Sequence, residues 1–354
     1  MSRYDDYTME IDGKSIWQVA AGDTDRDYSE TFLKWDVILI GPGDHGLWPN
    51  QEYINKYRSR PKKFNELKTF CEDAQDGDLV VLRRGTKELL GVGQIVGGYE
   101  WHDIFGDIDG WDLQHTRRVR WLWKELKEFP PYYFKWGSTF SLLESPGIRQ
   151  WLNSLGIPDE AYNRELIQLP SDKEHSRLDL DQISAYLFDC GIASNSIENL
   201  MHEMGGLIRV ANWYNRSGIK PSEDETRTYL VVPLLRALGW TQQNMAIEWN
   251  KIDVALFFGP RREDSTLSVV VEAKKKDKSC LTAQSQAEKY AKDKQTCRRL
   301  IVTDGLRYGV FKKSGDKFKL SAYMNLTRLI SNYPIYECDG ATALLYQISP
   351  ELTE

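Results

Sequence analysis

The segment SVVVEAK, residues 268–274, decides the fold of the second half of the chain. Its β-branched run is typical of a strand buried on both faces of a sheet, and we expect a strand over 267–273. The segment IDVAL, residues 252–256, predicts an earlier strand within 249–258. The pattern is completed by helices expected over 222–238 and 282–296 and strands expected over 300–303 and 308–312. This order predicts an α/β or α+β domain with a mixed sheet over residues 221–354, and we expect the α/β form.

Two carboxylates and a lysine occur on these two strands. Glu272 and Lys274 are two positions apart, so strand alternation places them on the same face. If the strands form a hairpin, Asp253 can neighbour Glu272, and a cation between the two carboxylates would relieve their repulsion. Carboxylates suit Mg²⁺, and a lysine beside the metal can orient or deprotonate a water and stabilise charge on a phosphate. The alternative is a surface salt bridge between Glu272 and Lys274, because this spacing is frequent by chance.

Three further motifs surround these residues in one order. They are ETR at 225–227 with PLLRALGW at 233–240, QAEKY at 286–290 and TDG at 303–305. With Ile252-Asp253 and Glu272-Ala273-Lys274, they make residues 222–312 resemble the PD-(D/E)XK nuclease superfamily. The branch that this segment resembles is the nuclease domain of type I restriction subunits and of related modification-dependent enzymes. Isoleucine replaces the proline of the motif name.

The resemblance implies a role for each matching residue. Asp253 and Glu272 would bind Mg²⁺, or Mn²⁺, with help from the carbonyl of Ala273. Lys274 would position or activate the attacking water. Glu225 would lie near the metal, directly or through a water.

The resemblance also implies that Gln286 and Tyr290 contact the DNA backbone or steady Lys274, although an ordinary amphipathic helix is the alternative. Positive charge is concentrated here, since residues 273–299 contain nine basic and three acidic residues, a net charge of +6 in a chain of net charge −6. Lysines outside the active site would follow phosphates without reading bases, and a solvated helix face is the alternative for half of them. The lysines expected at the DNA backbone are Lys275, Lys276 and Lys278.

A helical segment is expected over 146–220. Within it, apolar residues recur every three or four positions and predict one face of a long helix, which ends near 216–218. The segment reads as a helical connector, and a dimerisation helix is the alternative. The positions of that face are Ile197, Leu200, Met201, Met204, Ile208, Ala211 and Tyr214.

Tryptophan is concentrated in the first part of the chain, where eight of the twelve precede residue 140. Residues 1–145 are predicted to form mostly short strands, which favours a small α+β barrel. The segments IWQVAAG, VILIG, DGDLVV and LGVGQI, which begin at residues 16, 37, 76 and 90, resemble an EVE-type domain of the PUA-like superfamily. The resemblance implies that this domain flips a modified base into an aromatic-walled pocket.

Loop-like aromatic and polar residues are the candidates for that pocket, because aromatic faces stack on any base. Tryptophans inside strands are more often core residues than walls. The candidates are Trp48, Tyr99 and Trp101, with Trp17 and Trp35 as possible walls and Asp44, His45 and Asn50 for the base edge.

Several other classes of protein are excluded or disfavoured. The G-x-G-x-x-G match at 41–46 is followed by Pro49, which disfavours a dinucleotide-binding helix, and no NTP-binding motif occurs. No apolar run approaches eighteen residues, so no membrane span is expected. The N-terminus does not resemble a signal peptide, and the five scattered cysteines suggest a reducing cytoplasm.

Together these patterns predict a modification-dependent DNA endonuclease. Residues 1–145 would read a modified base in double-stranded DNA, and residues 221–354 would cut phosphodiesters with Mg²⁺. Cutting both strands needs two nuclease sites, so a homodimer is expected. The alternatives are a reader that binds nucleic acid without cutting it, or an RNA-directed nuclease or binding protein.

Overall fold

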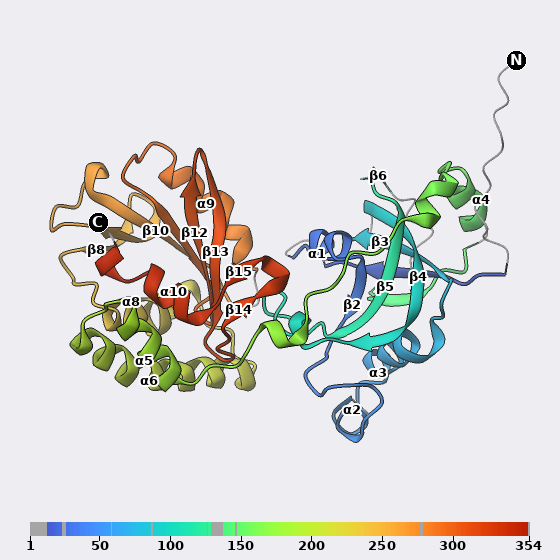
Figure 1. Ribbon diagram of the computed structural model, residues 1–354, viewed down its shortest axis with the longest axis horizontal. Helices are drawn as coiled ribbons and strands as arrows, with labels where there is room; N and C mark the ends of the chain where they lie inside the picture. The colour runs from blue at the N-terminus through green and yellow to red at the C-terminus, as the bar shows by residue number, and fades with distance from the viewer. Residues whose placement is uncertain are drawn as a thin grey trace, which may run out of the picture. The chain divides into compact units, whose positions relative to one another are not determined.

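The computed structural model describes residues 13–22, 26–57, 59–85, 88–125, 137–145, 147–276 and 279–352, and the backbone of residues 127 and 128. The chain divides into two compact units between Pro170 and Ser171 (Figure 1). Each unit contains its own mixed β-sheet. The described part of the chain contains no helix with the length and apolar character needed to cross a bilayer.

The first unit is built on a curved seven-stranded sheet (Figure 1). The strand order is β2-β5-β4-β3-β1-β7, and β6 pairs with β4. β1 and β3 are parallel, and the other pairs are antiparallel. The strands are β1 (Ile16–Ala20), β2 (Val37–Ile40), β3 (Leu79–Arg84), β4 (Glu88–Trp101), β5 (His115–Trp123), β6 (Lys127–Glu128) and β7 (Phe140–Leu142).

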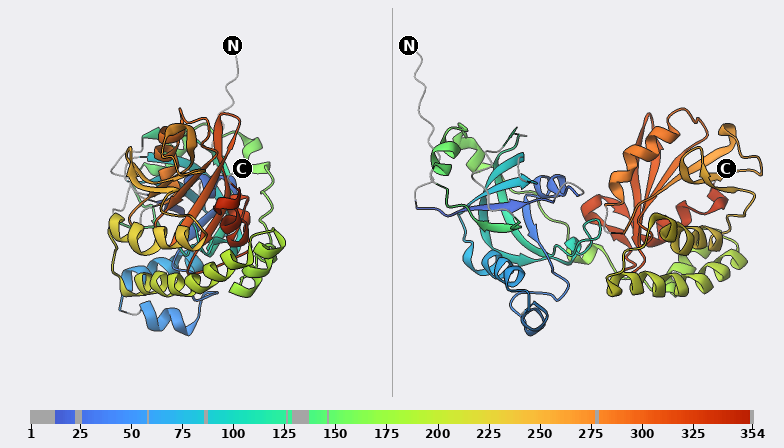
Figure 2. Two further views of the ribbon diagram at one scale, coloured as in Figure 1. Left: turned by 90° about the vertical axis from the view of Figure 1, so that its left-hand side faces the viewer. Right: turned by 180° about the vertical axis from the view of Figure 1, so that it is seen from behind.

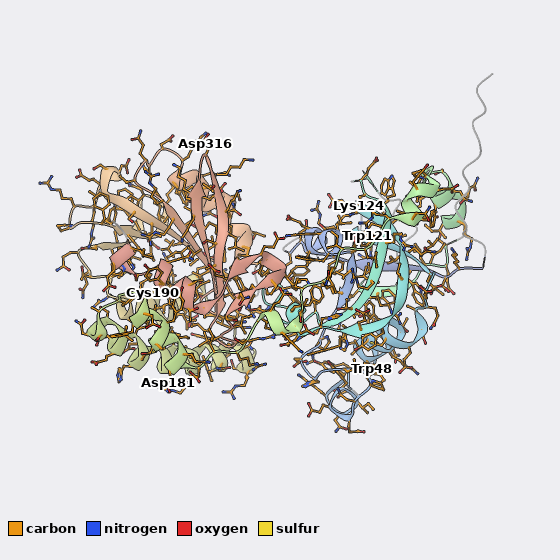
Figure 3. All side chains as sticks on the ribbon, viewed as in Figure 1. Trp48, Trp121, Lys124, Asp181, Cys190 and Asp316 are labelled. Atoms are coloured by element: carbon orange, nitrogen blue, oxygen red, sulfur yellow. The ribbon has the colours of Figure 1, made fainter. Side chains whose placement is uncertain are left out.

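Short helices lie between these strands and after β7. They are α1 (Ser29–Lys34), α2 (Gln51–Tyr57), α3 (Pro61–Lys68), a π-helical turn (Thr69–Asp73), α4 (Ile148–Asn153) and the 3₁₀ helices Asp103–Phe105 and Asp159–Asn163. The glycines of β4 make room for Trp121 of β5, because a Cβ added at Gly93 would lie 2.9 Å from the indole and 2.4 Å from Val119 (Figure 3). The G-V-G pattern of this strand therefore has a packing reason.

The second unit is built on an eight-stranded sheet of order β14-β15-β13-β12-β11-β10-β9-β8. The pairs β10–β11 and β13–β15 are parallel and the others antiparallel. Every residue of β10 is buried, as its β-branched run predicts. The strands are β8 (Met245–Trp249), β9 (Ile252–Phe257), β10 (Leu267–Ala273), β11 (Arg299–Thr303), β12 (Arg307–Ser314), β13 (Lys317–Asn325), β14 (Asn332–Tyr333) and β15 (Cys338–Asp339).

Helices cover both faces of this sheet (Figures 1 and 2). The face that includes Val254 and Val271 packs on α5, α6, α8 and α10, and the face that includes Ala255 and Val270 packs on α9. The helices are α5 (Leu180–Asp189), α6 (Ser194–Ser217), α7 (Glu223–Thr226), a π-helical turn (Arg227–Val231), α8 (Val232–Ala237), α9 (Gln284–Ala291), α10 (Ala341–Gln347) and the 3₁₀ helices Asp172–Glu174, Asp264–Thr266, Leu281–Ala283, Pro334–Tyr336 and Pro350–Leu352. The mixed α/β architecture expected for this half is confirmed at this level.

The helical segment 146–220 is shared by the two units instead of forming a separate connector. Ile148 and Leu152 of α4 join the core of the first unit. α5 and α6 join the core of the second unit, and α6 buries the face predicted from its periodicity, including Ile197 and Met204. The apolar face of α6 is therefore covered within its own unit. It is not exposed for the contact with a second copy that the dimerisation alternative would use.

Candidate functional site

The hairpin of β9 and β10 brings the two predicted carboxylates together. Val254 pairs with Val271, so the next residues outward along the two strands, Asp253 and Glu272, are neighbours. Asp253 Oδ2 accepts a hydrogen bond of 2.8 Å from the backbone N–H of Ala273. Asp253 is half-buried, whereas Glu272 is 2% exposed. The sheet therefore fixes two carboxylates at one end of the hairpin.

The two oxygens of Glu272 have different surroundings. Oε1 accepts a hydrogen bond of 2.9 Å from Lys274 Nζ. Oε2 is buried and has no hydrogen-bond partner in the described part of the chain. Burial raises the pKa of Glu272, the charges of Asp253 and Glu223 act in the same direction, and Lys274 opposes them. Because an unpaired buried carboxylate oxygen costs free energy, this position suits a cation.

Lys274 is held by the helix that follows β10. Its Nζ donates to Gln286 Oε1 at 2.8 Å, and Gln286 Nε2 donates to Tyr290 Oη at 3.4 Å. Gln286 and Tyr290 are four positions apart on α9, so they lie on one side of that helix. Glu272, Lys274, Gln286 and Tyr290 thus form one hydrogen-bonded chain.

Arg227 is a site residue that sequence reasoning missed. It lies in the π-helical turn and is 9% exposed. Its guanidinium pairs with Asp224, with Glu248 at 2.9 Å and with Asp253 Oδ1 at 3.5 Å. The sequence contains the signal, because Arg227 is the third residue of the ETR segment at 225–227.

Glu225, which the resemblance places near the metal, takes part in a helix cap. It is exposed and forms a capping box at the start of α7, where its carboxylate accepts from the Ser222 N–H at 2.8 Å and its own N–H donates to Ser222 Oγ at 3.1 Å. Its neighbour Glu223 is the acid of this helix whose charge acts on Glu272. The helix cap thus engages the side chain that was expected near the metal.

The donor set fits a hard cation with few protein ligands. No group of three or more His, Cys, Asp or Glu side chains is arranged around a metal position among the described residues. Mg²⁺ is commonly held by one or two carboxylates and keeps several waters. Asp253 and Glu272, with the carbonyl of Ala273, provide such a set.

The Thr303-Asp304-Gly305 motif has a structural role. Asp304 is buried, accepts from the N–H groups of Leu306 and Arg307, and pairs with the Arg307 guanidinium at 3.0 Å. Gly305 has φ +83°, and a Cβ there would lie 2.8 Å from Leu230 and Thr226. The turn therefore packs closely against the helix that carries Arg227.

The basic residues of 273–299 divide into different environments. Lys275 is exposed, whereas Lys276 is 8% exposed. Arg299 is buried and donates to the carbonyls of Gln347 and Leu352. Lys278 lies outside the described residues. Arg299, one of the basic residues that contribute to the net charge of +6, therefore holds the C-terminal segment in place within its own unit.

Of the aromatic residues proposed for the base pocket, Trp17, Trp35 and Trp48 are core residues, and Tyr99 is half-buried and hydrogen-bonded to its neighbours. Trp48 is 6% exposed, its Nε1 donates to Glu72 at 2.9 Å, and its backbone N–H donates to Tyr99 Oη at 3.1 Å (Figure 3). Tyr99 Oη lies 2.7 Å from His115 Nδ1. Trp17 donates to Asp78 at 2.8 Å, so its indole is satisfied inside the fold.

The remaining candidates are also buried or hydrogen-bonded within the first unit. Trp35 is 7% exposed, and Trp101 Nε1 donates to the Gly43 carbonyl at 3.0 Å. Asn50 donates to the carbonyls of His45 and Leu47 and accepts from two backbone N–H groups.

Asp44 and His45, in the same loop, also contact neighbouring side chains. Asp44 pairs with Lys56 at 2.9 Å, and His45 Nδ1 lies 3.2 Å from Glu52. Gly43, in the G-x-G-x-x-G match, lies against Gln114, where a Cβ would be 2.3 Å from the amide oxygen. These contacts shape the loop over 41–50.

A cavity of about 780 Å³ lies elsewhere in the first unit. None of the eight predicted pocket residues is among those that line it. It was missed because its walls come from many short segments that are far apart in sequence. Its aromatic walls are Tyr28, Phe32, Tyr57 and Trp111, its basic residues are Arg26, Arg60, Lys63 and Arg83, and its acid is Asp112.

Comparison with known proteins adds one finding for the first unit. Residues 17–142 match the model of a family described as a domain of unknown function, DUF8426. The match covers almost all strands of that unit's sheet, from β1 to β7. No curated protein matches the chain.

Proposed function

We propose that this chain is a Mg²⁺-dependent, modification-dependent DNA endonuclease that acts in defence against foreign or phage DNA. Its second unit would be a PD-(D/E)XK nuclease domain. Its first unit would be an EVE/PUA-like barrel that receives a flipped modified base. The observation that carries the proposal is the buried Oε2 of Glu272, which lies beside Asp253 and has no hydrogen-bond partner among the described residues, with Lys274 hydrogen-bonded to the other oxygen.

The residues of the site support hydrolysis of a phosphodiester. Asp253 and Glu272 would hold the metal, which supplies positive charge at the phosphate and lowers the pKa of a bound water. Lys274 donates its N–H groups next to this position, where it would orient the attacking water or stabilise charge on the phosphate. Gln286 keeps Lys274 in place, and Arg227 keeps Asp253 in place.

A reader that binds nucleic acid without cutting it is the second candidate. The observation that favours it is the ion pair between Arg227 and Asp253, which gives the carboxylate a protein partner without a metal. The cavity of the first unit would serve this function equally well.

Cleavage assays separate the two candidates. Duplexes with different modified cytosines and an unmodified duplex are incubated with Mg²⁺ or with EDTA. We expect Mg²⁺-dependent cuts in modified duplexes, and loss of these cuts in Lys274→Ala but not in Lys317→Ala, which changes an exposed lysine of β13. Binding without any cut would support the reader, and equal cutting of all duplexes would exclude modification dependence.

A homodimer is part of the proposal, because one nuclease site cuts one strand. The mass of the chain bound to its duplex, measured by light scattering, tests this point. A single chain that cuts both strands in one binding event would contradict it.

A further inference from the structure

Arg227 is surrounded by three carboxylates from three elements of the second unit. Its guanidinium pairs with Asp224 of α7, with Glu248 of β8 at 2.9 Å and with Asp253 of β9 at 3.5 Å. The side chains of Asp224 and Glu248 are 81% and 69% exposed, whereas that of Arg227 is 11% exposed. One mostly buried cation therefore serves three acids, of which Asp253 belongs to the proposed metal site.

The shape of the guanidinium suits this position. Its Nη2 donates to two of the acids, and its Nη1 lies 3.5 Å from Asp253 Oδ1. A guanidinium presents five N–H donors in one rigid plane, so it can contact several acids at once. The backbone that carries it is held closely, because Gly305 packs against Thr226 and Leu230, on either side of Arg227.

Asp253 and Glu272 are not equally open to a cation. Asp253 Oδ2 accepts from the Ala273 N–H at 2.8 Å, and its Oδ1 faces Arg227. On Glu272, Oε1 accepts from Lys274, and Oε2 has no hydrogen-bond partner in the described part of the second unit. A cation shared by both carboxylates would therefore be held at Glu272 Oε2, while Oδ1 of Asp253 already has a positive charge beside it.

The positive charge of this guanidinium is permanent. Burial lowers the pKa of Arg227, but the hydrogen bonds with Glu248 and Asp224 and the charge of its third acid outweigh burial and raise this pKa. A metal ion that took over the three carboxylates would leave a mostly buried guanidinium without its partners, which is unfavourable. The arginine therefore disfavours a metal ion at this cluster of acids.

From this arrangement we infer that Arg227 takes the place of a second metal ion, so that the site holds one Mg²⁺. The inference rests on the proposed function and names the number of ions that this function uses. Nucleases with two ions hold them about 3.5–4 Å apart, and both ions stabilise charge around the phosphate. Here Asp253 and Glu272 would hold the single ion, and the guanidinium beside Asp253 Oδ1 would supply the second positive charge.

Counting bound Mn²⁺ tests the inference without DNA and without cleavage. Mn²⁺ is the probe because its paramagnetic resonance signal distinguishes free from bound ions. We expect the full-length chain to bind one ion at saturation and Arg227→Gln to bind two, because the three carboxylates are then left without a cation. Two ions in the wild-type chain, or one ion in a folded Arg227→Gln, would overturn the inference. The wild-type count tests it even if Arg227→Gln does not fold.

Three further variants connect the count to this position. Arg227→Lys keeps the charge and should bind one ion. Arg227→Gln combined with Glu248→Gln should return to one ion, because the cluster loses one of its acids. Arg236→Gln removes the same charge from an exposed position in the last turn of α8 and should also bind one ion. A second ion in any of these three variants would overturn the inference, and thermal melts show whether each variant folds.

Cleavage assays separate failure of the inference from failure of the proposed function. One bound ion without a cut in any duplex would leave the inference standing and exclude the nuclease. Two ions in the wild-type chain with Mg²⁺-dependent cuts would exclude the inference and support the nuclease.

Discussion

Lys274 Nζ lies 2.9 Å from Glu272 Oε1, and the other oxygen of the same carboxylate is buried without a hydrogen-bond partner among the described residues. One oxygen thus positions the lysine while the other remains available. We expect Lys274→Ala to reduce Mg²⁺-dependent cleavage by about a hundredfold or more, because the group beside the reacting phosphate is lost. DNA affinity should change little in gel-shift assays. Cleavage at the wild-type rate would contradict the assigned role.

Glu272→Gln should remove Mg²⁺ binding, measured by calorimetry on the chain without DNA. In the wild type, Glu272 must lose its proton to bind the cation, and burial raises its pKa. Mg²⁺ affinity should therefore fall as the pH is lowered, beginning above the usual range of a glutamate, with protons released on binding. Glu225→Gln is the control and should bind Mg²⁺ normally, since Glu225 caps α7.

Arg227→Gln should lower the cleavage rate, because Asp253 loses the guanidinium that lies 3.5 Å from its Oδ1. Arg227→Lys should recover only part of the rate, since lysine keeps the charge but not the forked donor geometry. Glu248→Gln removes an exposed partner of Arg227 and should have little effect. If Glu248→Gln is as damaging as Arg227→Gln, Arg227 acts through Glu248 and not through Asp253.

Gly305→Ala should destabilise the second unit. The residue has φ +83°, and its Cβ would meet Leu230 and Thr226 at 2.8 Å. Gly315→Ala is the matched control, because Gly315 has φ +62° and nothing within 4 Å of an added Cβ. Backbone strain alone costs about 1–2 kcal/mol at such a position, and the clash should add about 1–3 kcal/mol at Gly305. Thermal melts that show equal losses would contradict the packing argument.

His115 should make the stability of the first unit depend on pH. It is fully buried between Tyr99 and the Pro42 carbonyl, and burial lowers the pKa of His115 to about 4. The unfolded chain, with a histidine pKa of about 6.5, binds more protons below that pH, so stability is complete above pH 6.5 and falls toward pH 4 by roughly 3 kcal/mol in total.

Urea unfolding followed by tryptophan fluorescence can measure this loss, since most tryptophans belong to the first unit. His115→Gln should flatten the pH dependence below pH 6.5, whatever its effect on stability at neutral pH. His202→Gln, an exposed histidine of α6, should leave the slope unchanged. An unchanged slope in His115→Gln would show that other groups cause the acid sensitivity.

The second unit was more predictable than the first. The β-branched run of β10 specifies a buried strand, and its bounds agree with the expected 267–273. The strand expected over 249–258 is interrupted after its first residue, Trp249, which ends β8. Asn250 and Lys251 adopt positive φ values of 50° and 73° in a turn, and β9 begins after that turn. Asn250 tolerates a positive φ and is a turn signal, but Lys251 is not one, so the local pattern marks this turn only weakly.

The helix expected over 222–238 contains a π-helical turn over Arg227–Val231, just before Pro233. Proline lacks the N–H that would continue the regular ladder, which accounts for the irregularity. Strand alternation brought Glu272 and Lys274 together as expected. The capping box of Ser222 and Glu225 agrees with the expectation that Ser222 begins this helix, whereas the effect of Glu223 on the pKa of Glu272 depends on contacts between segments that the sequence does not reveal.

The base pocket shows a different limit of sequence reasoning. Polar neighbours suggest an exposed Trp48, yet Glu72, 24 positions away, accepts its indole N–H and makes its burial possible. The cavity itself combines α1, the end of α2, the start of α3 and the segment 110–113. Contacts between such distant segments leave no periodicity in the sequence.

The hairpin of β9 and β10 has a practical consequence. Phe257 pairs with Leu267 at the connected end, whereas Asp253 and Glu272 lie at the opposite end. The exposed residues 260 and 261 in that connection therefore offer a place for an inserted fluorophore or affinity tag that leaves the carboxylates undisturbed. Labelled protein of this kind would allow single molecules to be followed as they search DNA.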